Sequence, residues 1–182
     1  MIHFNTTNDG KYREVASFLH GHGIEIERER LPAPEVQADT LEEVVRYSLD
    51  VLAGLTAKDV MVDDSGFFVD ALGGFPGVYS AYTFRTIGIR GLLRLMEGVE
   101  NRQARFETVM GLRIGHGVHV FTGACPGTVA LEPRGKEGFG FDPIFVPHGE
   151  EKTFAEMAMG EKNAISHRGN AANKVAEFLK GR

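Results

Sequence analysis

Short β-prone runs alternate with amphipathic helical segments in the first third of the chain, and this alternation limits the fold more than any other feature. IHFNT (2–6), IEIERE (24–29) and VMVDD (60–64) have the composition of strands. Asn8 is placed to cap one helix and Thr40 to open another. Strands that alternate with helices are typical of α/β proteins, so the sequence predicts an α/β fold.

The remainder of the chain continues the mixture of helices and strands. The patterns predict a helix over roughly 88–97, a β-hairpin across Gly115-His116-Gly117 and a final helix over about 170–180. Residues 132–149 are rich in glycine and proline, and regular patterns resume on both sides. This segment is therefore expected to be a functional loop and not a linker between domains.

Length and composition limit the class of protein. The chain has 182 residues, 42% hydrophobic and 25% charged, which fits one globular domain over 1–182, or two tightly joined lobes, with an ordinary buried core. A formal net charge of −5 and no long Lys/Arg run argue against binding to a nucleic acid polymer. No apolar run approaches the roughly 20 residues that cross a membrane.

The cellular location is predicted from the N-terminus and the cysteine content. The start MIHFNTTNDG has neither the basic nor the apolar region of a secretion signal. A single cysteine, Cys125, cannot form an internal disulfide. We therefore expect a cytoplasmic protein.

The segment TTNDGK (6–11) lies where the first predicted strand meets the first predicted helix. Free backbone N–H groups and the helix dipole favour an anion at such a place, and Lys11 would add a full positive charge. The alternative is a capped helix followed by a solvated lysine. The segment lacks the GxxxxGK[ST] pattern of the phosphate loop of NTPases.

Two adjacent acids, Asp63 and Asp64, end an apolar strand and are followed by Ser65-Gly66. Side chains alternate along a strand, so only one of the two can point into a given cleft. Carboxylates of this kind suit Mg²⁺, which takes one or two of them together with phosphate oxygens. An acidic turn without a ligand is the alternative. Glu43 lies three residues after Thr40, which is the spacing of a capping box.

Two segments near the C-terminus carry the remaining candidate residues. KEGFGFDPIF (136–145) places two phenylalanines, glycines and Asp142 in one loop, which either binds a ligand or plugs the core. SHRGNA (166–171) places a hydroxyl, an imidazole and a guanidinium before the last helix. Taken alone, Ser166 fits a helix cap, and His167 lacks the spacing of a zinc ligand.

Considered together, five segments resemble one known pattern. TTNDGK, DDSGFFVDALGGFPGVYSA, GFGFDPIF, KTFAEM and SHRGNA occur in this order between residues 6 and 171. The chain resembles the inosine triphosphate pyrophosphatase family, enzymes that hydrolyse non-standard purine nucleoside triphosphates. The set of segments is far more specific than any single one.

The resemblance implies roles for individual residues. Asp64 would work with Mg²⁺ and activate water, beside Ser65, and Glu43 would be the metal ligand on the helix, in competition with its capping role. Phe139 would stack on the base, Gly140 and Phe141 would complete the wall, and Asp142 would read the base edge. The phosphate-binding turn and the remaining nucleotide contacts would come from Thr6, Thr7, Asn8, Lys11, Lys162, His167 and Arg168.

One position departs from the family pattern. Many members have a lysine one helical turn after the metal-binding glutamate, and Ser48 stands there in this chain. One phosphate contact is then missing or comes from elsewhere, with Arg85 as a candidate. The departure also leaves open whether Glu43, Glu42 or Glu35 is the second metal ligand.

The donor and acceptor patterns of the bases predict the substrate preference. Hypoxanthine and xanthine present an O6 acceptor beside an N1–H donor, so Asp142 can accept from N1–H while His167 or Arg168 donates to O6. Adenine inverts both positions, and mispaired buried polar groups would reject ATP strongly. The sequence does not identify the residue that excludes GTP.

The predicted reaction is metal-assisted attack of water between the α- and β-phosphates of ITP, dITP or XTP, which yields a monophosphate and pyrophosphate. Removal of these nucleotides would keep them out of DNA and RNA. A phosphatase that releases orthophosphate and a non-catalytic nucleotide sensor are the alternatives.

The resemblance also implies an architecture and an assembly. It implies a mixed, twisted sheet split over two lobes, with a central nucleotide-binding cleft, and a homodimer. The apolar segment GGFPGVYSAYTF (73–84) is a candidate for the dimer contact, with a packed core loop as the alternative.

Overall fold

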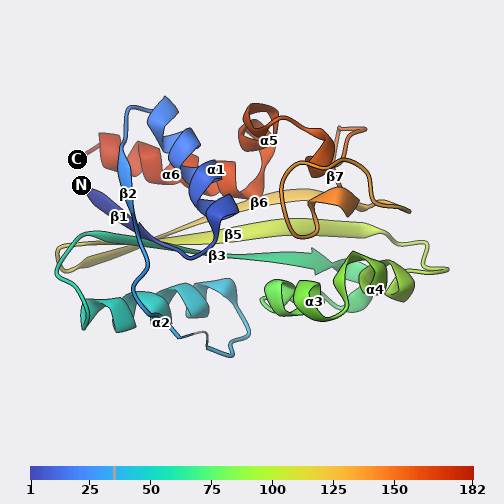
Figure 1. Ribbon diagram of the computed structural model, residues 1–182, viewed down its shortest axis with the longest axis horizontal. Coiled ribbons are helices and arrows are strands. Elements are labelled where there is room, and N and C mark those ends of the chain that lie inside the picture. The colour runs from blue at the N-terminus through green and yellow to red at the C-terminus, as the bar shows by residue number, and fades with distance from the viewer. Residues whose placement is uncertain (35) are drawn as a thin grey trace.

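A computed structural model of the chain describes residues 1–34 and 36–182. Glu35, one of the alternative metal ligands, lies outside the described residues. A mixed sheet with the strand order β2-β1-β3-β5-β6-β7 forms the centre of the molecule, and β4 pairs with β3 (Figure 1). β1 runs parallel to β2 and β3, whereas the later strands are antiparallel. The mixed α/β class predicted from the sequence is confirmed.

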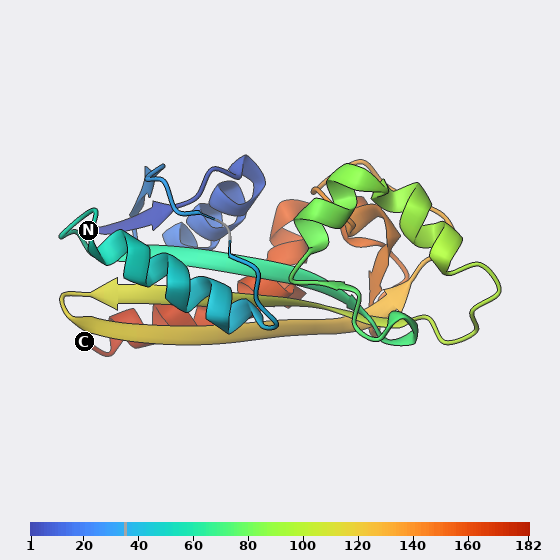
Figure 2. The same cartoon turned by 90° about the horizontal axis from the view of Figure 1, so that it is seen from below.

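The strands differ greatly in length. The long ones are β3, β5 and β6, which run from one end of the molecule to the other (Figure 2). The bounds are β1 Ile2–Asn5, β2 Ile26–Glu29, β3 Val60–Val69, β4 Pro76–Gly77, β5 Gln103–Ile114, β6 Gly117–Val129 and β7 Phe145–Pro147. Strand β3 therefore carries both the buried residues Val60–Val62 and the polar residues Asp63, Asp64 and Ser65 that follow them.

Helices cover both faces of the sheet. Helices α1 (Asp9–Gly21), α5 (Met159–Ile165) and α6 (His167–Lys180) lie on one face, and α2 (Leu41–Ala53), α3 (Ser80–Thr86) and α4 (Gly88–Leu95) lie on the other (Figure 1). Short 3₁₀ turns occupy Asp70–Leu72, Asp142–Ile144 and Phe154–Glu156. No helix in the described part of the chain has the length and apolar character needed to cross a bilayer.

The caps predicted from the sequence fix the start of two helices. The Asn8 side chain accepts a hydrogen bond from the Lys11 N–H at 3.0 Å. At the start of α2, Thr40 and Glu43 form the full capping box. Each cap satisfies backbone N–H groups that a helix start leaves without partners, which stabilises the helix by about 1 kcal/mol. These caps place the first turn of α1 and that of α2 beside the sheet.

The predicted hairpin across Gly115 and the final helix are confirmed, but α3 and α5 were not predicted. Each of these two helices has only seven residues, and the residue before each, Tyr79 or Ala158, makes no side-chain capping hydrogen bond. The predicted helix over 88–97 ends at Leu95. Helices this short give little periodic signal, so their existence depends on tertiary packing.

The core is divided along the sheet. Beneath α1 and α6, Phe4, Val15 and Met61 belong to one cluster, and a second cluster packs under α2. At the other end, an aromatic cluster contains Phe67, Phe106, Phe141, Phe145 and Phe154. Ring centroids there lie 4.7 to 5.9 Å apart, the separation at which aromatic pairs attract one another. This aromatic cluster includes Phe141, from the loop that carries Phe139.

Candidate active site

A hollow of about 350 Å³ opens where the first turn of α1, strand β3, helix α3, the loop at 139–142 and the start of α6 meet. The volume suits a small organic ligand. The lining contains these residues predicted from the sequence: Asn8, Lys11, Asp64, Ser65, Arg85, Phe139, Gly140, Phe141, Asp142, His167 and Arg168. The predicted residues outside the lining are Thr6, Thr7, Glu43 and Lys162. The fold thus joins segments that lie up to about 160 positions apart in the sequence.

The turn before α1 organises the positive end of the hollow. The Thr6 hydroxyl accepts from the Asn8 N–H at 3.2 Å, so Thr6 supports the turn from outside the lining. Lys11 Nζ donates to the Asp63 carbonyl oxygen at 3.1 Å. It also lies 3.2 Å from Asp63 Oδ1 and 3.8 Å from Asp64 Oδ1. Lys11 therefore stands between the helix start and the two acids.

The acids Asp63 and Asp64 have different surroundings, as alternation along a strand requires. The Asp63 side chain is 1% exposed and faces Lys11 and Arg168, whereas that of Asp64 is 24% exposed and lines the hollow. Asp63 Oδ1 meets Lys11 as an ion pair without hydrogen-bond geometry. The Asp63 carboxylate is therefore paired with cations of the protein, and Asp64 is the acid at the edge of the hollow.

Ser65 links the sheet to α6. Its hydroxyl lies 2.7 Å from the Thr108 hydroxyl on β5, its register partner, and accepts from Arg168 Nη2 at 2.9 Å. Arg168 Nε donates to Asp63 Oδ2 at 3.3 Å. These hydrogen bonds fix the orientation of the Arg168 guanidinium, which lines the hollow.

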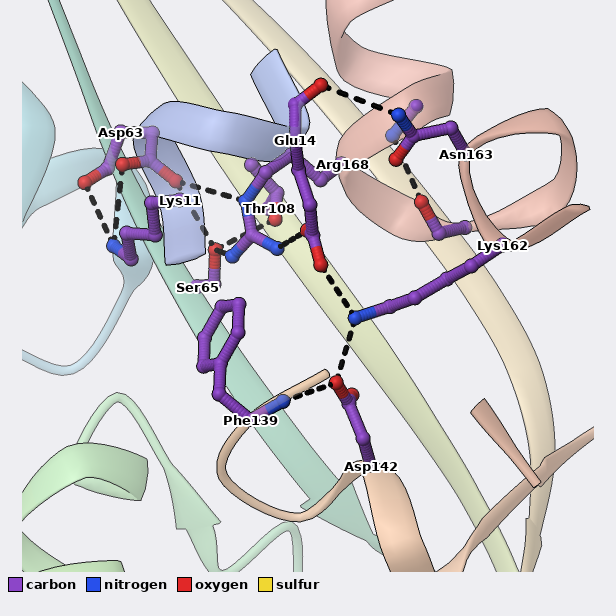
Figure 3. A network of polar contacts seen from close by, with 12 residues as sticks. Lys11, Glu14, Asp63, Ser65, Thr108, Phe139, Asp142, Lys162, Asn163 and Arg168 are labelled. Atoms are coloured by element: carbon purple, nitrogen blue, oxygen red, sulfur yellow. Dashed lines mark hydrogen bonds and ion pairs between the residues drawn. The ribbon is translucent and has the colours of Figure 1, made fainter. Parts of the chain in front are cut away.

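Glu14, on α1, joins the two buried cations, and the sequence analysis did not identify it. Its carboxylate accepts from Lys162 Nζ at 2.6 Å and from Arg168 Nη1 at 2.5 Å (Figure 3). Burial raises the pKa of Glu14, but the charges of Arg168 and Lys162 outweigh burial and leave the pKa below its ordinary value. Burial lowers the pKa of Arg168, but the negative charges of Glu14 and Asp63 outweigh burial and raise this pKa above its ordinary value.

Asp142 is buried and holds the loop. Its Oδ2 accepts from the Phe139 backbone N–H at 2.8 Å and from Lys162 Nζ at 2.6 Å. Burial raises the pKa of Asp142, and Lys162 offsets this only in part. Glu14 differs although it shares Lys162, because it has Arg168 as a second cation. Asp142 thus reaches the hollow with one oxygen already engaged in fixing the loop.

The two phenylalanines of the loop have separate environments. Phe141 is buried in the aromatic cluster, with its ring stacked on Phe67 at 5.4 Å and edge-on to Phe84 at 5.4 Å. The Phe139 ring is half-buried and lies near the cations Lys162 and Arg168, at 5.2 and 5.3 Å from the ring centroid. Phe139 is therefore the ring available to a ligand, and Phe141 braces the wall.

His167, at the start of α6, is a buried neutral imidazole. Its ring stacks on Phe106 at 4.7 Å, and its Nδ1 atom has no hydrogen-bond partner in the part of the chain that the structure describes. Burial, together with the nearby charges of Arg168 and Lys162, holds the pKa of His167 well below its usual value.

Glu43 lies outside the hollow, at the exposed start of α2. Its Oε2 atom accepts from the backbone N–H groups of Asp39 and Thr40 and from the Thr40 hydroxyl. Within the described residues, no group of three or more His, Cys, Asp or Glu side chains is arranged to hold a metal ion. Any metal role for Glu43 therefore has to share the carboxylate with the capping box.

Comparison with known proteins supplies the family. The model of the Ham1 family matches residues 2–178. The chain belongs to the Ham1 family. This result confirms the family predicted from the five sequence segments.

Relatives of this Ham1 family protein match it over nearly their whole length. A dITP/XTP pyrophosphatase of Pyrococcus horikoshii is 51% identical over 179 residues, which is 98% of this chain and 96% of the relative. One of Methanopyrus kandleri is 51% identical over 178 residues, which is 97% of this chain and 95% of the relative. A HAM1 protein of Coxiella burnetii superimposes with a TM-score of 0.88 at 31% identity, covering 100% of this chain and 98% of that one. The Ham1 protein of Staphylococcus aureus gives 0.84 at 30% identity, with 99% and 98% covered.

Proposed function

We propose that this Ham1 family protein hydrolyses ITP, dITP and XTP to the nucleoside monophosphate and pyrophosphate, with Mg²⁺ as cofactor. One observation carries the proposal: a single hollow joins Lys11 at a helix start, the partly exposed acid Asp64 and the half-buried ring of Phe139. These are the groups that a triphosphate, a reacting water and a base require. The names of the relatives, dITP/XTP pyrophosphatases, agree with this chemistry.

The donor set suits Mg²⁺. This ion needs one or two carboxylates and completes its coordination with substrate phosphates and water. Asp64, partly exposed at the edge of the hollow, offers one carboxylate, and Glu43 would be the second only if it shares its oxygen with the capping box. When bound, Mg²⁺ supplies stabilisation of the charge that develops on the phosphate oxygens.

The protein's own residues account for the remaining steps. Lys11 and the N–H groups at the start of α1 hold the β- and γ-phosphates. Asp64 orients a water molecule and accepts its proton as the oxygen bonds to the α-phosphorus. The bond from that phosphorus to the bridging oxygen breaks, and pyrophosphate leaves. Arg85, which lines the same hollow, is the candidate for the phosphate contact that Ser48 does not provide.

The base would be recognised by stacking and by its polar edge. Phe139 offers a ring face that tolerates any purine. Asp142 keeps acceptor capacity beyond its contacts to Phe139 and Lys162, and Arg168 keeps N–H donors for O6. Lys162 lies outside the lining, so its proposed contribution is to hold Asp142 and Glu14 in place.

The test is incubation with ITP, dITP, XTP, ATP and GTP plus Mg²⁺, with pyrophosphate and orthophosphate measured separately. We expect pyrophosphate from the first three and little product from ATP and GTP. Orthophosphate would indicate a phosphatase, and the absence of any product would indicate a nucleotide sensor. Equal rates on ATP would refute the account of base recognition. Asp64→Asn should bind ITP but lose turnover, and undiminished turnover would remove Asp64 from its role.

A pair of loop variants tests the division between the phenylalanines. Phe139→Ala should weaken ITP binding about 5- to 150-fold, the equivalent of one lost stacking contact of about 1–3 kcal/mol. Phe141→Ala should mainly lower the free energy of unfolding, by about 3–5 kcal/mol, because its ring belongs to the core. Equal losses of ITP affinity in the two variants would contradict the division.

We also propose that the protein is a cytoplasmic homodimer that cleanses the nucleotide pool. Exposed Phe75, Tyr79, Tyr82 and Ile87 gather on α3 and the segments next to it, around a second hollow. A patch of this kind favours contact with a protein surface. Light scattering should give a dimer mass for the native chain and a monomer mass for Tyr82→Lys. A monomeric native chain would remove this part of the proposal.

A further inference from the structure

Gly10, the second residue of α1, lies directly against the Phe139 ring. A methyl group at Gly10 would stand 2.5 Å from Phe139 Cδ1 and 2.7 Å from Cε1, closer than real contacts of such atoms. The ring comes from the loop at 136–142 and lies against the helix that carries Lys11, and Phe139 and Lys11 line the same hollow. The Phe139 ring therefore occupies the space that a side chain at position 10 would need.

The ring has little freedom to move aside. The Phe139 backbone N–H is tied to Asp142, and the ring lies near Lys162 and Arg168 (Figure 3). Asp142 and Lys162 are themselves buried and ion-paired at 2.6 Å. A side chain at position 10 would thus displace the ring into the hollow or pull the loop away from its anchors.

Backbone conformation does not explain a glycine at this position. Gly10 lies in the first turn of a helix and has a negative φ, unlike Gly138 and Gly140 in the loop, whose φ values are +72° and +63°. In such a place alanine is the better helix former. The close approach of the Phe139 ring is the tightest of the contacts that favour glycine over alanine here.

We propose that Gly10 is a positioning residue for nucleotide binding. By lacking a side chain it lets the Phe139 ring seat against α1, and this contact sets the spacing between the stacking surface and the phosphate-binding turn at Asn8 and Lys11. The inference rests on the proposed function, because it assigns Phe139 to the base.

The test compares Gly10→Ala with Gly21→Ala, at the end of the same helix, where a methyl group meets nothing within 4 Å. Gly10→Ala should raise the KM for ITP about tenfold, which is within the range for a displaced stacking ring. Its melting temperature should fall only slightly, because the better helix propensity of alanine, about 1 kcal/mol, offsets part of the cost of displacing the half-buried ring. Gly21→Ala should leave KM unchanged. Adding Gly10→Ala to Phe139→Ala should cause no further rise in KM.

The outcomes separate the inference from the function on which it rests. If the native protein releases no pyrophosphate from any nucleotide, the proposed function fails. If the native protein is active and Gly10→Ala keeps its KM, the inference is overturned. A methyl group at Gly10 would also lie 3.2 Å from Asn8 Oδ1, the helix cap. If Gly10→Ala raises KM equally with and without the Phe139 ring, disturbance of this cap is the cause and the inference is overturned.

Discussion

Replacing Glu14 with glutamine should strongly destabilise the protein, because it removes the negative charge that two buried cations share. The Glu14 side chain is 7% exposed and accepts from Lys162 and Arg168, two cations with 4% and 3% exposure. Glutamine offers one neutral oxygen and turns an N–H₂ group toward a cation, so at least one buried positive charge loses its partner. Breaking a buried ion pair in this way costs about 3–5 kcal/mol. Two charge-assisted hydrogen bonds of about 1.5–3 kcal/mol each give a similar total.

Urea unfolding at pH 7 measures this loss, with linear extrapolation to water. Thermal unfolding should show a decrease of about 6–20 °C, since 1 kcal/mol corresponds to about 2–4 °C in a chain of this size. Glu42→Gln is the matched control. Glu42 pairs with Arg46 one helical turn away, but its side chain is 48% exposed, and such pairs contribute only a few tenths of a kcal/mol.

The reasoning is refuted if Glu14→Gln loses less than about 1 kcal/mol at an unchanged urea dependence. A double-mutant cycle with Lys162→Met adds a second check. Because the two residues are in direct contact, the double variant should lose less than the sum of the single losses. An additive result would mean that Glu14 acts independently of Lys162.

Burial of His167, Cys125 and Gly123 has consequences that can be measured. The pKa of His167 is depressed in the folded protein, so below about pH 6.5 only the unfolded chain gains the proton and the native protein loses stability. His167→Phe has no such proton to gain, so the free energy of unfolding of the native protein relative to the variant should decrease by about 1.4 kcal/mol per pH unit in acid. A difference that stays constant with pH in urea titrations would contradict this. Burial raises the pKa of Cys125 to about 11, which lowers the fraction of reactive thiolate. Iodoacetamide at pH 8 should therefore label Cys125 at least 100-fold more slowly in the folded than in the unfolded protein. Equal rates would refute its burial. Gly123→Ala should lower the free energy of unfolding by about 1–3 kcal/mol or more, because its methyl group would lie 2.2 Å from the His167 carbonyl oxygen. Gly160→Ala, whose methyl group meets nothing within 4 Å, is the control and should change this free energy little. Similar urea midpoints for the two variants would refute the close packing of β6 on α6.

Local patterns predicted the elements that carry their own signals. Asn8 and Thr40 opened helices as expected, and the turn at Gly115 joined the hairpin. These features depend on hydrogen bonds within a few residues, so neighbours in the sequence suffice to define them. Helices α3 and α5 lack such caps, and only packing against the rest of the molecule reveals them.

The candidate site was predicted in part. The segments around Lys11, Asp64 and Phe139 were recognised, and the structure brings them to one hollow. Glu14 was missed because a glutamate beside Val15 in an amphipathic helix looks like a solvated residue. Its burial becomes evident only when α5 and α6 bring Lys162 and Arg168 to it from about 150 positions away.

The sequence by itself determined the α/β class, the family and the chemical types of the site residues, because these follow from local patterns and from the order of short segments. The tertiary structure alone decided that Asp64 faces the hollow and that Asp63 is buried in ion pairs with Lys11 and Arg168. It also decided that Phe139, and not Phe141, is the accessible ring, and that this ring seats on Gly10. The physical reason is that burial, charge pairing and steric contact arise between segments far apart in the chain, where local sequence holds no record of them.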